Sequence, residues 1–229
     1  MIQKCYNNLR RSQRLIDKCH HISSLRTPMK ITRNISSKNK IFSKKIQKNI
    51  FLDKNLSFVQ VLSLFNIFQN YYNNIINFSK NNRVKIRAPN FPESLSENIV
   101  RWFIINNEHR DCISPAKGDL LCPDTNKRIE VKCFTSNGPS TFGSNEPWDE
   151  LWFLDASNLI KSEFKIYKCT LSNKSNEWNS IRFNANTTFG DMCKTGKRPR
   201  INFTGLKKQI NSNMKLVYSG NLLGLDKKF

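Results

Sequence analysis

The amino-acid sequence predicts an α/β fold with a mixed central β-sheet flanked by helices. Apolar residues recur every three or four positions between residues 56 and 104, whereas two-residue alternation and short apolar runs dominate from residue 118 onward. The first pattern is typical of amphipathic helices and the second of strands. The whole chain has 38% hydrophobic residues, including 16 Phe and 4 Trp, which is enough apolar content for one packed domain over residues 51–229.

The net charge points to an anionic partner. The 229-residue chain carries 38 Lys and Arg against 17 Asp and Glu, a formal net charge of +21. Nucleic acid is the commonest partner of such a chain, with a membrane surface or an acidic protein as the alternative. No apolar run approaches membrane-spanning length, and the seven cysteines are odd in number and lack a Cys-x-x-Cys pair. We therefore expect a soluble, intracellular protein.

Residues 1–50 form a separate basic segment. They contain thirteen Lys or Arg residues against one acid, Asp17, which is a net charge of +12. This composition predicts a partly disordered N-terminal arm that holds DNA through its phosphates. An Arg-rich, Ser-containing and acid-poor N-terminus is also typical of a mitochondrial transit peptide, so both interpretations stay open.

Two helices are expected before the strands. Residues 56–79 present one wide apolar stripe, which favours a core contact or a dimer interface. Two prolines between Arg87 and Pro92 interrupt the pattern. A second helix is predicted to begin near Ser94, because Ser94 and Glu97 have the spacing of a capping box ahead of an apolar run.

The stretch from Gly118 to Phe134 predicts a β-hairpin. Side chains alternate between the two faces of a strand, so Ile129 and Val131 share the apolar face while Glu130 and Lys132 share the other. A four-residue loop over residues 124–127 would pair Pro123 with Arg128 and place Asp119 opposite Lys132. Asp119 would then join Glu130 and Lys132 on the polar face. A slip by one residue would remove it from that face.

Two converging carboxylates repel each other unless a cation lies between them. Hard oxygen ligands suit Mg²⁺, which keeps several waters and bridges to phosphate. A neighbouring lysine can hold or deprotonate a water and offset the charge of a phosphate. The hairpin therefore has the equipment for metal-assisted phosphodiester hydrolysis, and a surface hairpin with an ordinary Glu–Lys pair is the alternative.

These residues resemble a known signature. Asp119, ten intervening residues and Glu130-Val131-Lys132 look like the active site of PD-(D/E)xK nucleases, and most closely that of type II restriction endonucleases. The resemblance extends from about Phe91 to Ile210. It implies a restriction-endonuclease-like sheet, Mg²⁺ held by Asp119, Glu130 and the Val131 carbonyl, and a catalytic Lys132.

The resemblance also implies a supporting carboxylate on the upstream helix. Glu97 is the candidate, with Glu93 as another option and capping of its own helix as the alternative role of Glu97. The chain departs from the signature at Gly118, where the family has proline. The literal Pro-Asp pair is Pro123-Asp124, but Asp124 falls in the predicted turn, where aspartate has an ordinary role.

Two further segments are candidates for DNA contact. Residues 135–148 form a polar loop directly after the catalytic strand, and residues 194–200 form a basic loop in front of apolar Ile201 and Phe203. Such loops suit phosphate contact or base reading by Arg in the major groove, and a solvated surface loop is the alternative. The expected DNA-binding residues are Ser136, Asn137, Arg182, Lys194, Lys197, Arg198 and Arg200.

Together these observations predict a Mg²⁺-dependent, sequence-specific endonuclease that cuts double-stranded DNA. A symmetric site is cut most simply by a homodimer, and the resemblance to restriction enzymes implies a cognate DNA methyltransferase as functional partner. One alternative is a repair or junction-resolving nuclease of the same superfamily. The other is a basic DNA-binding protein without catalytic activity.

Overall fold

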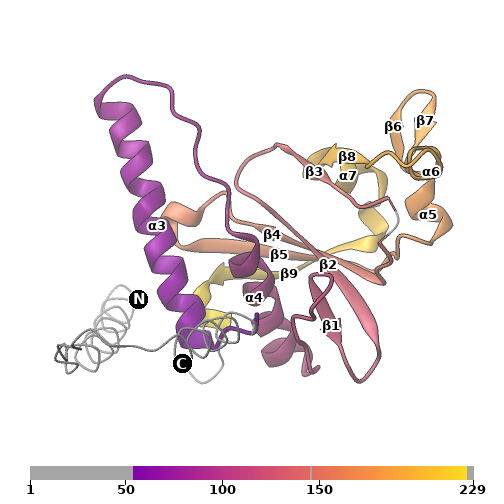
Figure 1. The fold of residues 1–229 in the computed structure, drawn as a ribbon, viewed down its shortest axis with the longest axis horizontal. Coiled ribbons are helices and arrows are strands. Elements are labelled where there is room, and N and C mark those ends of the chain that lie inside the picture. The colour runs from indigo at the N-terminus through magenta and orange to yellow at the C-terminus, as the bar shows by residue number, and fades with distance from the viewer. Residues whose placement is uncertain (1–53, 145, 226–229) are drawn as a thin grey trace, which may run out of the picture. The chain divides into compact units, whose positions relative to one another are not determined.

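A computed structural model describes residues 54–144 and 146–225, and Figure 1 shows the arrangement of their elements. The prediction for residues 1–50 lies outside the described residues. The α-helices of the described residues are α3 (Phe58–Asn81), α4 (Glu93–Phe103), α5 (Asn176–Asn179), α6 (Phe189–Lys194) and α7 (Phe203–Gln209), and a π-helix, η1 (Ile104–Glu108), follows α4 directly. The strands are β1 (Leu120–Cys122), β2 (Lys127–Phe134), β3 (Pro139–Thr141), β4 (Glu150–Asp155), β5 (Glu163–Cys169), β6 (Arg182–Asn184), β7 (Thr187–Thr188), β8 (Arg200–Asn202) and β9 (Met214–Asn221).

Five strands form the central sheet in the order β1-β2-β4-β5-β9. Strands β2 and β4 run parallel, whereas β1 with β2, β4 with β5, and β5 with β9 are antiparallel. The sheet is therefore mixed, as predicted. Two short ribbons, β3 with β8 and β6 with β7, lie beside it, near α5, α6 and α7 (Figure 1).

Helices α3 and α4 cover one face of the sheet. Helix α3 begins with the capping box of Ser57 and Gln60, and it buries Phe58, Val61, Phe65 and Phe68 in the same core as Ile129 and Val131 of β2. Burial of one apolar stripe stabilises such a helix more than its own propensity does.

The opposite face of the sheet has a core of its own. Leu151 and Phe153 of β4 pack there with Trp178, Phe189 and Leu206, which come from the helices of the C-terminal half. Because β4 is buried on both faces, all of its residues except Asp155 are buried. The polar face of the β1–β2 hairpin belongs to this second side, next to β3 and β8.

Several element boundaries differ from the prediction. Helix α4 begins at Glu93 after Pro92, so Ser94 lies inside the helix and the predicted capping box is wrong. The backbone carbonyl of Ser94 instead accepts a hydrogen bond from Asn98 Nδ2 at 2.8 Å. Within the described part of the chain, no helix is both long and apolar enough to cross a membrane.

Candidate active site

The hairpin that carries the predicted site has the expected faces but a different register. Its four-residue turn is Pro123–Asn126, so Cys122 pairs with Lys127 and Leu120 pairs with Ile129. The prediction that Pro123 pairs with Arg128 is wrong, because Asn126 takes the left-handed conformation, with φ of 50°, and closes the turn one residue earlier. The register moves by two residues. A shift by two preserves the face of every side chain, so Asp119 moves from Lys132 to the position beside Glu130.

A local feature explains why glycine precedes Asp119. Gly118 has φ of 90°, a conformation that proline cannot adopt because its ring fixes φ near −65°. The departure from the Pro-Asp pattern therefore follows from the backbone that leads into β1. Asp124, the acid of the literal Pro-Asp pair, is exposed in the turn.

Asp119, Glu130 and Lys132 are each held by a contact within the hairpin. Asp119 Oδ2 accepts a hydrogen bond from the backbone N–H of Val131 at 2.8 Å, which fixes the carboxylate across β2. Lys132 Nζ lies 2.5 Å from Glu130 Oε1 and 5.8 Å from the centre of the Phe142 ring. Both charged side chains of this pair are mostly buried, with 21% of the Lys132 side chain and 13% of the Glu130 side chain exposed. Water therefore screens their interaction less than at an open surface.

The two carboxylates are held in an environment that disfavours their charge. Burial raises the pKa of Asp119, and the charges of Glu93 and Glu146 raise it further, while the Val131 hydrogen bond and Lys132 lower it. Burial likewise raises the pKa of Glu130, as does repulsion from Asp119, while Lys132 opposes the shift. A bound cation would stabilise the charged forms of both carboxylates and offset the repulsion between them.

Glu97 belongs to the same electrostatic neighbourhood. Burial and the charge of Asp119 raise the pKa of Glu97 to about 7, with Glu93 and Glu130 adding to the shift and Lys54 opposing it. Because Glu97 lies inside α4, it does not cap its own helix, and that alternative role is excluded. Glu93, in the first turn of the same helix, also raises the pKa of Asp119 through its charge.

The structure adds an acid that the sequence did not single out. Glu146, from the loop between β3 and β4, raises the pKa values of both Asp119 and Glu130. No local pattern marks it, because only the fold brings this loop back over β2. The described residues nevertheless include no group of three His, Cys, Asp or Glu side chains close enough to hold a metal ion.

The expected DNA-binding segments come together on the same side of the sheet. Strand β3 pairs with β8, which sets Thr141 opposite Arg200, and Thr204 donates a hydrogen bond to Asn137 at 3.2 Å. Arg200 therefore lies in a strand, and Lys194 ends α6, so only residues 195–199 form the basic loop. Arg182 begins β6. The exposed candidates are Ser136, Asn137, Arg182, Lys194, Lys197, Arg198 and Arg200.

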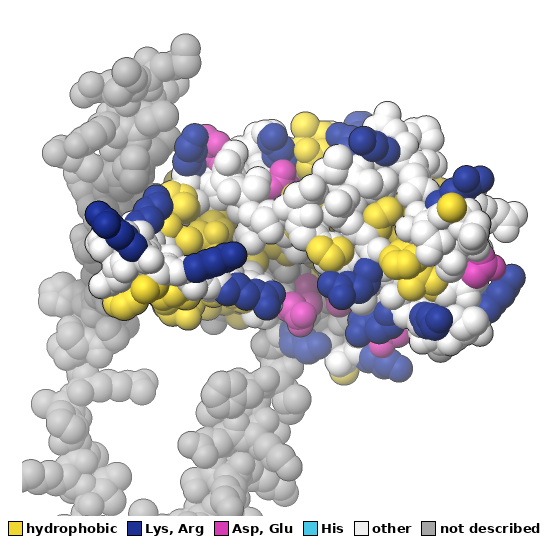
Figure 2. Space-filling view, turned by 90° about the horizontal axis from the view of Figure 1, so that it is seen from above, with side chains coloured by type: hydrophobic (Ala, Val, Ile, Leu, Met, Phe, Trp, Pro, Cys, Tyr) yellow, Lys and Arg dark blue, Asp and Glu magenta, His cyan; other side chains and the backbone are white. Residues whose placement is uncertain are grey.

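Figure 2 shows the charges on this side of the molecule. Asp and Glu side chains appear near the middle of the view and at several other places, and Lys and Arg side chains are spread over most of this face. A surface rich in Lys and Arg suits contact with a phosphate backbone.

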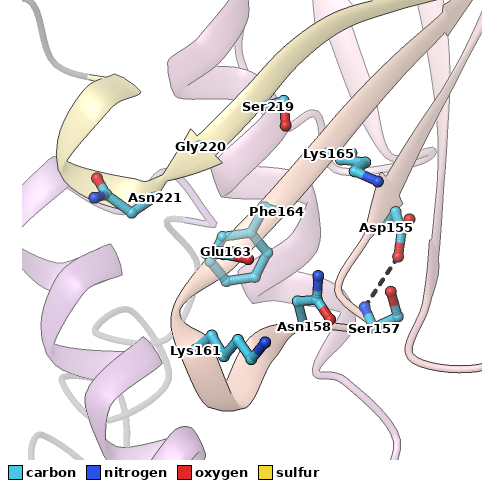
Figure 3. Close-up of a pocket in the computed structure, with 10 residues that line it drawn as sticks. All are labelled: Asp155, Ser157, Asn158, Lys161, Glu163, Phe164, Lys165, Ser219, Gly220 and Asn221. Atoms are coloured by element: carbon cyan, nitrogen blue, oxygen red, sulfur yellow. Dashed lines mark hydrogen bonds between the residues drawn. The ribbon is translucent and has the colours of Figure 1, made fainter.

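A separate pocket of about 410 Å³ opens where β4 ends and β5 begins (Figure 3). It contains Asp155, whose Oδ1 accepts a hydrogen bond from the Ser157 backbone at 3.0 Å, together with Lys161 and Lys165. In the sheet, Asp155 of β4 lies opposite Phe134 of β2, which is two residues after Lys132. The Phe134 ring stacks on the Phe203 ring, with 4.8 Å between the ring centres. This pocket does not include the Asp119–Glu130 pair.

Comparison with known proteins gives the site its context. The family model of the Bsp6I restriction endonuclease matches residues 54–211, a range that contains α4, the hairpin and the β3–β8 ribbon. The chain belongs to the Bsp6I restriction endonuclease family. It is 33% identical over 133 residues to the type II restriction enzyme Bsp6I of Bacillus sp. (strain RFL6), which covers 56% of this chain and 69% of that enzyme. No solved structure matches the chain.

Membership of this family supports the resemblance found in the sequence. The matched range begins after residues 1–53, so the basic N-terminal segment is not part of it. It includes Asp119, Glu130 and Lys132 together with the helix carboxylates. The protein is a type II restriction-endonuclease-like nuclease with a mixed α/β fold.

Proposed function

We propose that this member of the Bsp6I family is a Mg²⁺-dependent, sequence-specific endonuclease that hydrolyses phosphodiester bonds in double-stranded DNA. The observation that carries the proposal is the group formed by Asp119, Glu130 and Lys132 on one face of the β1–β2 hairpin, with Lys132 Nζ 2.5 Å from Glu130 Oε1. A partly buried acid–acid–lysine group, in a chain that also exposes the basic loop of residues 195–199 and Arg200, suits hydrolysis of a phosphate ester.

The donor set fits Mg²⁺. Asp119 and Glu130 supply hard carboxylate oxygens, and burial with mutual repulsion raises the pKa values of both, so a cation would relieve the repulsion between them. The Val131 carbonyl is the proposed third protein ligand. Waters would complete the shell of a magnesium ion, which rarely binds in an all-protein cage. When bound, the ion would supply positive charge to the phosphate and to its attacking water.

The remaining roles fall to residues of the chain itself. Lys132 would orient the attacking water and offset the charge that develops on the phosphate oxygens. Glu130 holds the lysine in place through their contact of 2.5 Å, so the ammonium group is positioned before DNA arrives. Glu97 would support the site from α4, with Glu93 as the other option. A carboxyl group with a pKa near 7 could accept or release a proton at neutral pH.

Sequence recognition is assigned to the β3–β8 ribbon and its neighbours. A two-stranded ribbon fits the major groove, and Arg can bind guanine through two hydrogen bonds. Arg198 and Arg200 are the proposed base-reading residues, with Ser136, Asn137, Arg182, Lys194 and Lys197 on phosphates or base edges. Phe203 anchors this unit to the sheet, because it packs on Phe134, Phe153 and Tyr167.

A second copy of the chain is the proposed partner. Helix α3 exposes Ile67, Tyr71 and Phe78 at 64%, 52% and 55%, all on one side, and carries one charged residue, Lys80. A nearly uncharged apolar stripe allows two strongly basic chains to meet without repulsion at the contact. A homodimer would bring one site to each DNA strand. A methyltransferase that modifies the same sequence would protect the host DNA.

The deciding experiment is a digest of plasmid DNA with and without Mg²⁺. We expect discrete fragments that require the ion, and loss of cleavage with retained DNA binding in Asp119→Ala and Glu130→Ala. Asp124→Ala is the matched control, because it removes an exposed acid from the turn of the same hairpin. Cleavage at branched DNA alone would favour a repair or junction-resolving nuclease. Binding without any cleavage would leave a non-catalytic DNA-binding protein.

A further inference from the structure

The last turn of α3 and the chain that follows it, together the connecting segment to α4, carry four cations within residues 80–87. Lys80, Arg83, Lys85 and Arg87 are all exposed, and within the described part of the chain none of them forms a salt bridge. The cations of the sheet behave differently. Lys168, for example, lies 2.7 Å from Glu108, and Lys132 lies 2.5 Å from Glu130. The charges of this connecting segment are therefore available to an external anion.

The start of this segment is held by its own hydrogen bonds. The backbone N–H of Asn82 bonds to the Phe78 carbonyl at 3.0 Å, and Arg83 then takes a left-handed conformation with φ of 53°. The N–H of Val84 bonds back to the Ser79 carbonyl at 3.0 Å. The chain beyond has no helix or strand up to Pro92, and in its sequence basic Arg83, Lys85 and Arg87 alternate with apolar Val84 and Ile86.

The segment leads directly to the catalytic group. It ends at Pro92, and Glu93 and Glu97 follow in the first turns of α4. In Figure 1 it lies on one side of the N-terminal end of α4, and β3 and β8 lie on the other side.

We infer that Lys80, Arg83, Lys85 and Arg87 form a second phosphate-binding surface, which grips the DNA backbone across the catalytic group from the β3–β8 ribbon. The inference rests on the proposed function, since it assumes that DNA lies over Asp119 and Glu130. This surface contributes affinity and no sequence preference, because phosphates are the same at every base pair. The ribbon reads the sequence, and the connecting segment holds the duplex against the site.

The test uses the full chain and a short fluorescein-labelled duplex of arbitrary sequence, with anisotropy measured at several salt concentrations in EDTA. We expect Lys85→Ala to weaken binding and to flatten the plot of log affinity against log salt by roughly one for each phosphate that is no longer neutralised. The double variant Lys85→Ala/Arg87→Ala should flatten it about twice as much.

Lys215→Ala is the matched control, since it also removes one exposed lysine. Lys215 of β9 lies opposite Lys168 of β5 in the sheet, on the face that carries Trp152 and away from the β3–β8 ribbon. The Lys215→Ala substitution should leave the salt dependence of DNA binding unchanged. An unchanged slope in the Lys85 and Arg87 variants would overturn the inference, as would an equal change in the control. Because no cleavage is measured, failure of the plasmid digest would refute the nuclease proposal without deciding this result.

Discussion

At the scale of single residues, Lys132 is the side chain whose removal should separate chemistry from binding. Its ammonium group lies 2.5 Å from Glu130 and beside the Phe142 ring, so it is fixed where charge would develop on the phosphate. We expect Lys132→Ala to lower the cleavage rate by at least about 100-fold, a typical effect of removing a positioned proton-transfer group. Affinity for DNA should change little, and single-turnover kinetics with a binding titration measure both.

Lys127→Ala is the control for that variant. Lys127 lies on the same strand, on the opposite face, and contacts Glu150 at 3.3 Å. Its removal takes one positive charge from β2 without touching the catalytic group, so the cleavage rate should stay close to that of the wild type. Equal reductions of the cleavage rate in the two variants would mean that Lys132 contributes only positive charge to the surface. Lys132 would then have no role in the chemical step.

At the scale of elements, a partly buried ion-pair network ties the segment after α4, which contains Glu108 and Arg110, to the sheet. Glu150, whose side chain is 6% exposed, accepts two hydrogen bonds of 3.0 Å from Arg110, which also contacts Glu108 at 2.5 Å. Burial would raise the pKa of Glu150, but the hydrogen bonds and charge of Arg110 hold it below its usual range. The charged form of Glu150 therefore stabilises the fold.

This network makes the free energy of unfolding depend on pH. Since the pKa of Glu150 is lower in the folded protein, its contribution is present above its ordinary value of 4.5 and is lost as pH falls through the folded value. We expect Glu150→Gln to lower the free energy of unfolding by about 3 kcal/mol at pH 7, because Arg110 loses its partner. Urea titrations should show the difference from wild type shrinking below pH 4.5. A constant difference, or an equal one in the exposed Glu163→Gln, would contradict this.

The same elements show what the sequence could predict. The faces of the hairpin were predicted correctly because two-residue alternation does not depend on the exact register. The register itself was wrong because it depends on a single left-handed residue, Asn126, which no periodicity marks. The capping box at Ser94 was wrong because Glu93 had already begun the helix after Pro92. Glu146 could not be found at all, since a long loop returns it to the site.

At the scale of the whole molecule, charge is divided unevenly along the chain. Residues 1–50 carry a net +12 of the total +21, and the family model matches only from residue 54. The proposed catalytic residues Asp119, Glu130 and Lys132, the β3–β8 ribbon and the connecting segment all lie within the matched range. Catalysis and sequence preference should therefore belong to residues 54–229, and the N-terminal segment should add affinity that does not depend on sequence.

Deletion of residues 1–50 tests this division. We expect the shortened protein to cut plasmid DNA into the same fragments at low salt, because none of the proposed catalytic or base-reading residues is removed. Its affinity should fall equally on cognate and scrambled duplexes, and the salt dependence should become shallower by roughly one for each phosphate that the segment would have neutralised. The ratio of the two affinities is the control, since it isolates sequence preference from charge. A shortened protein that is inactive at low salt, or in which the two affinities have become equal, would place residues 1–50 within the catalytic or recognition machinery.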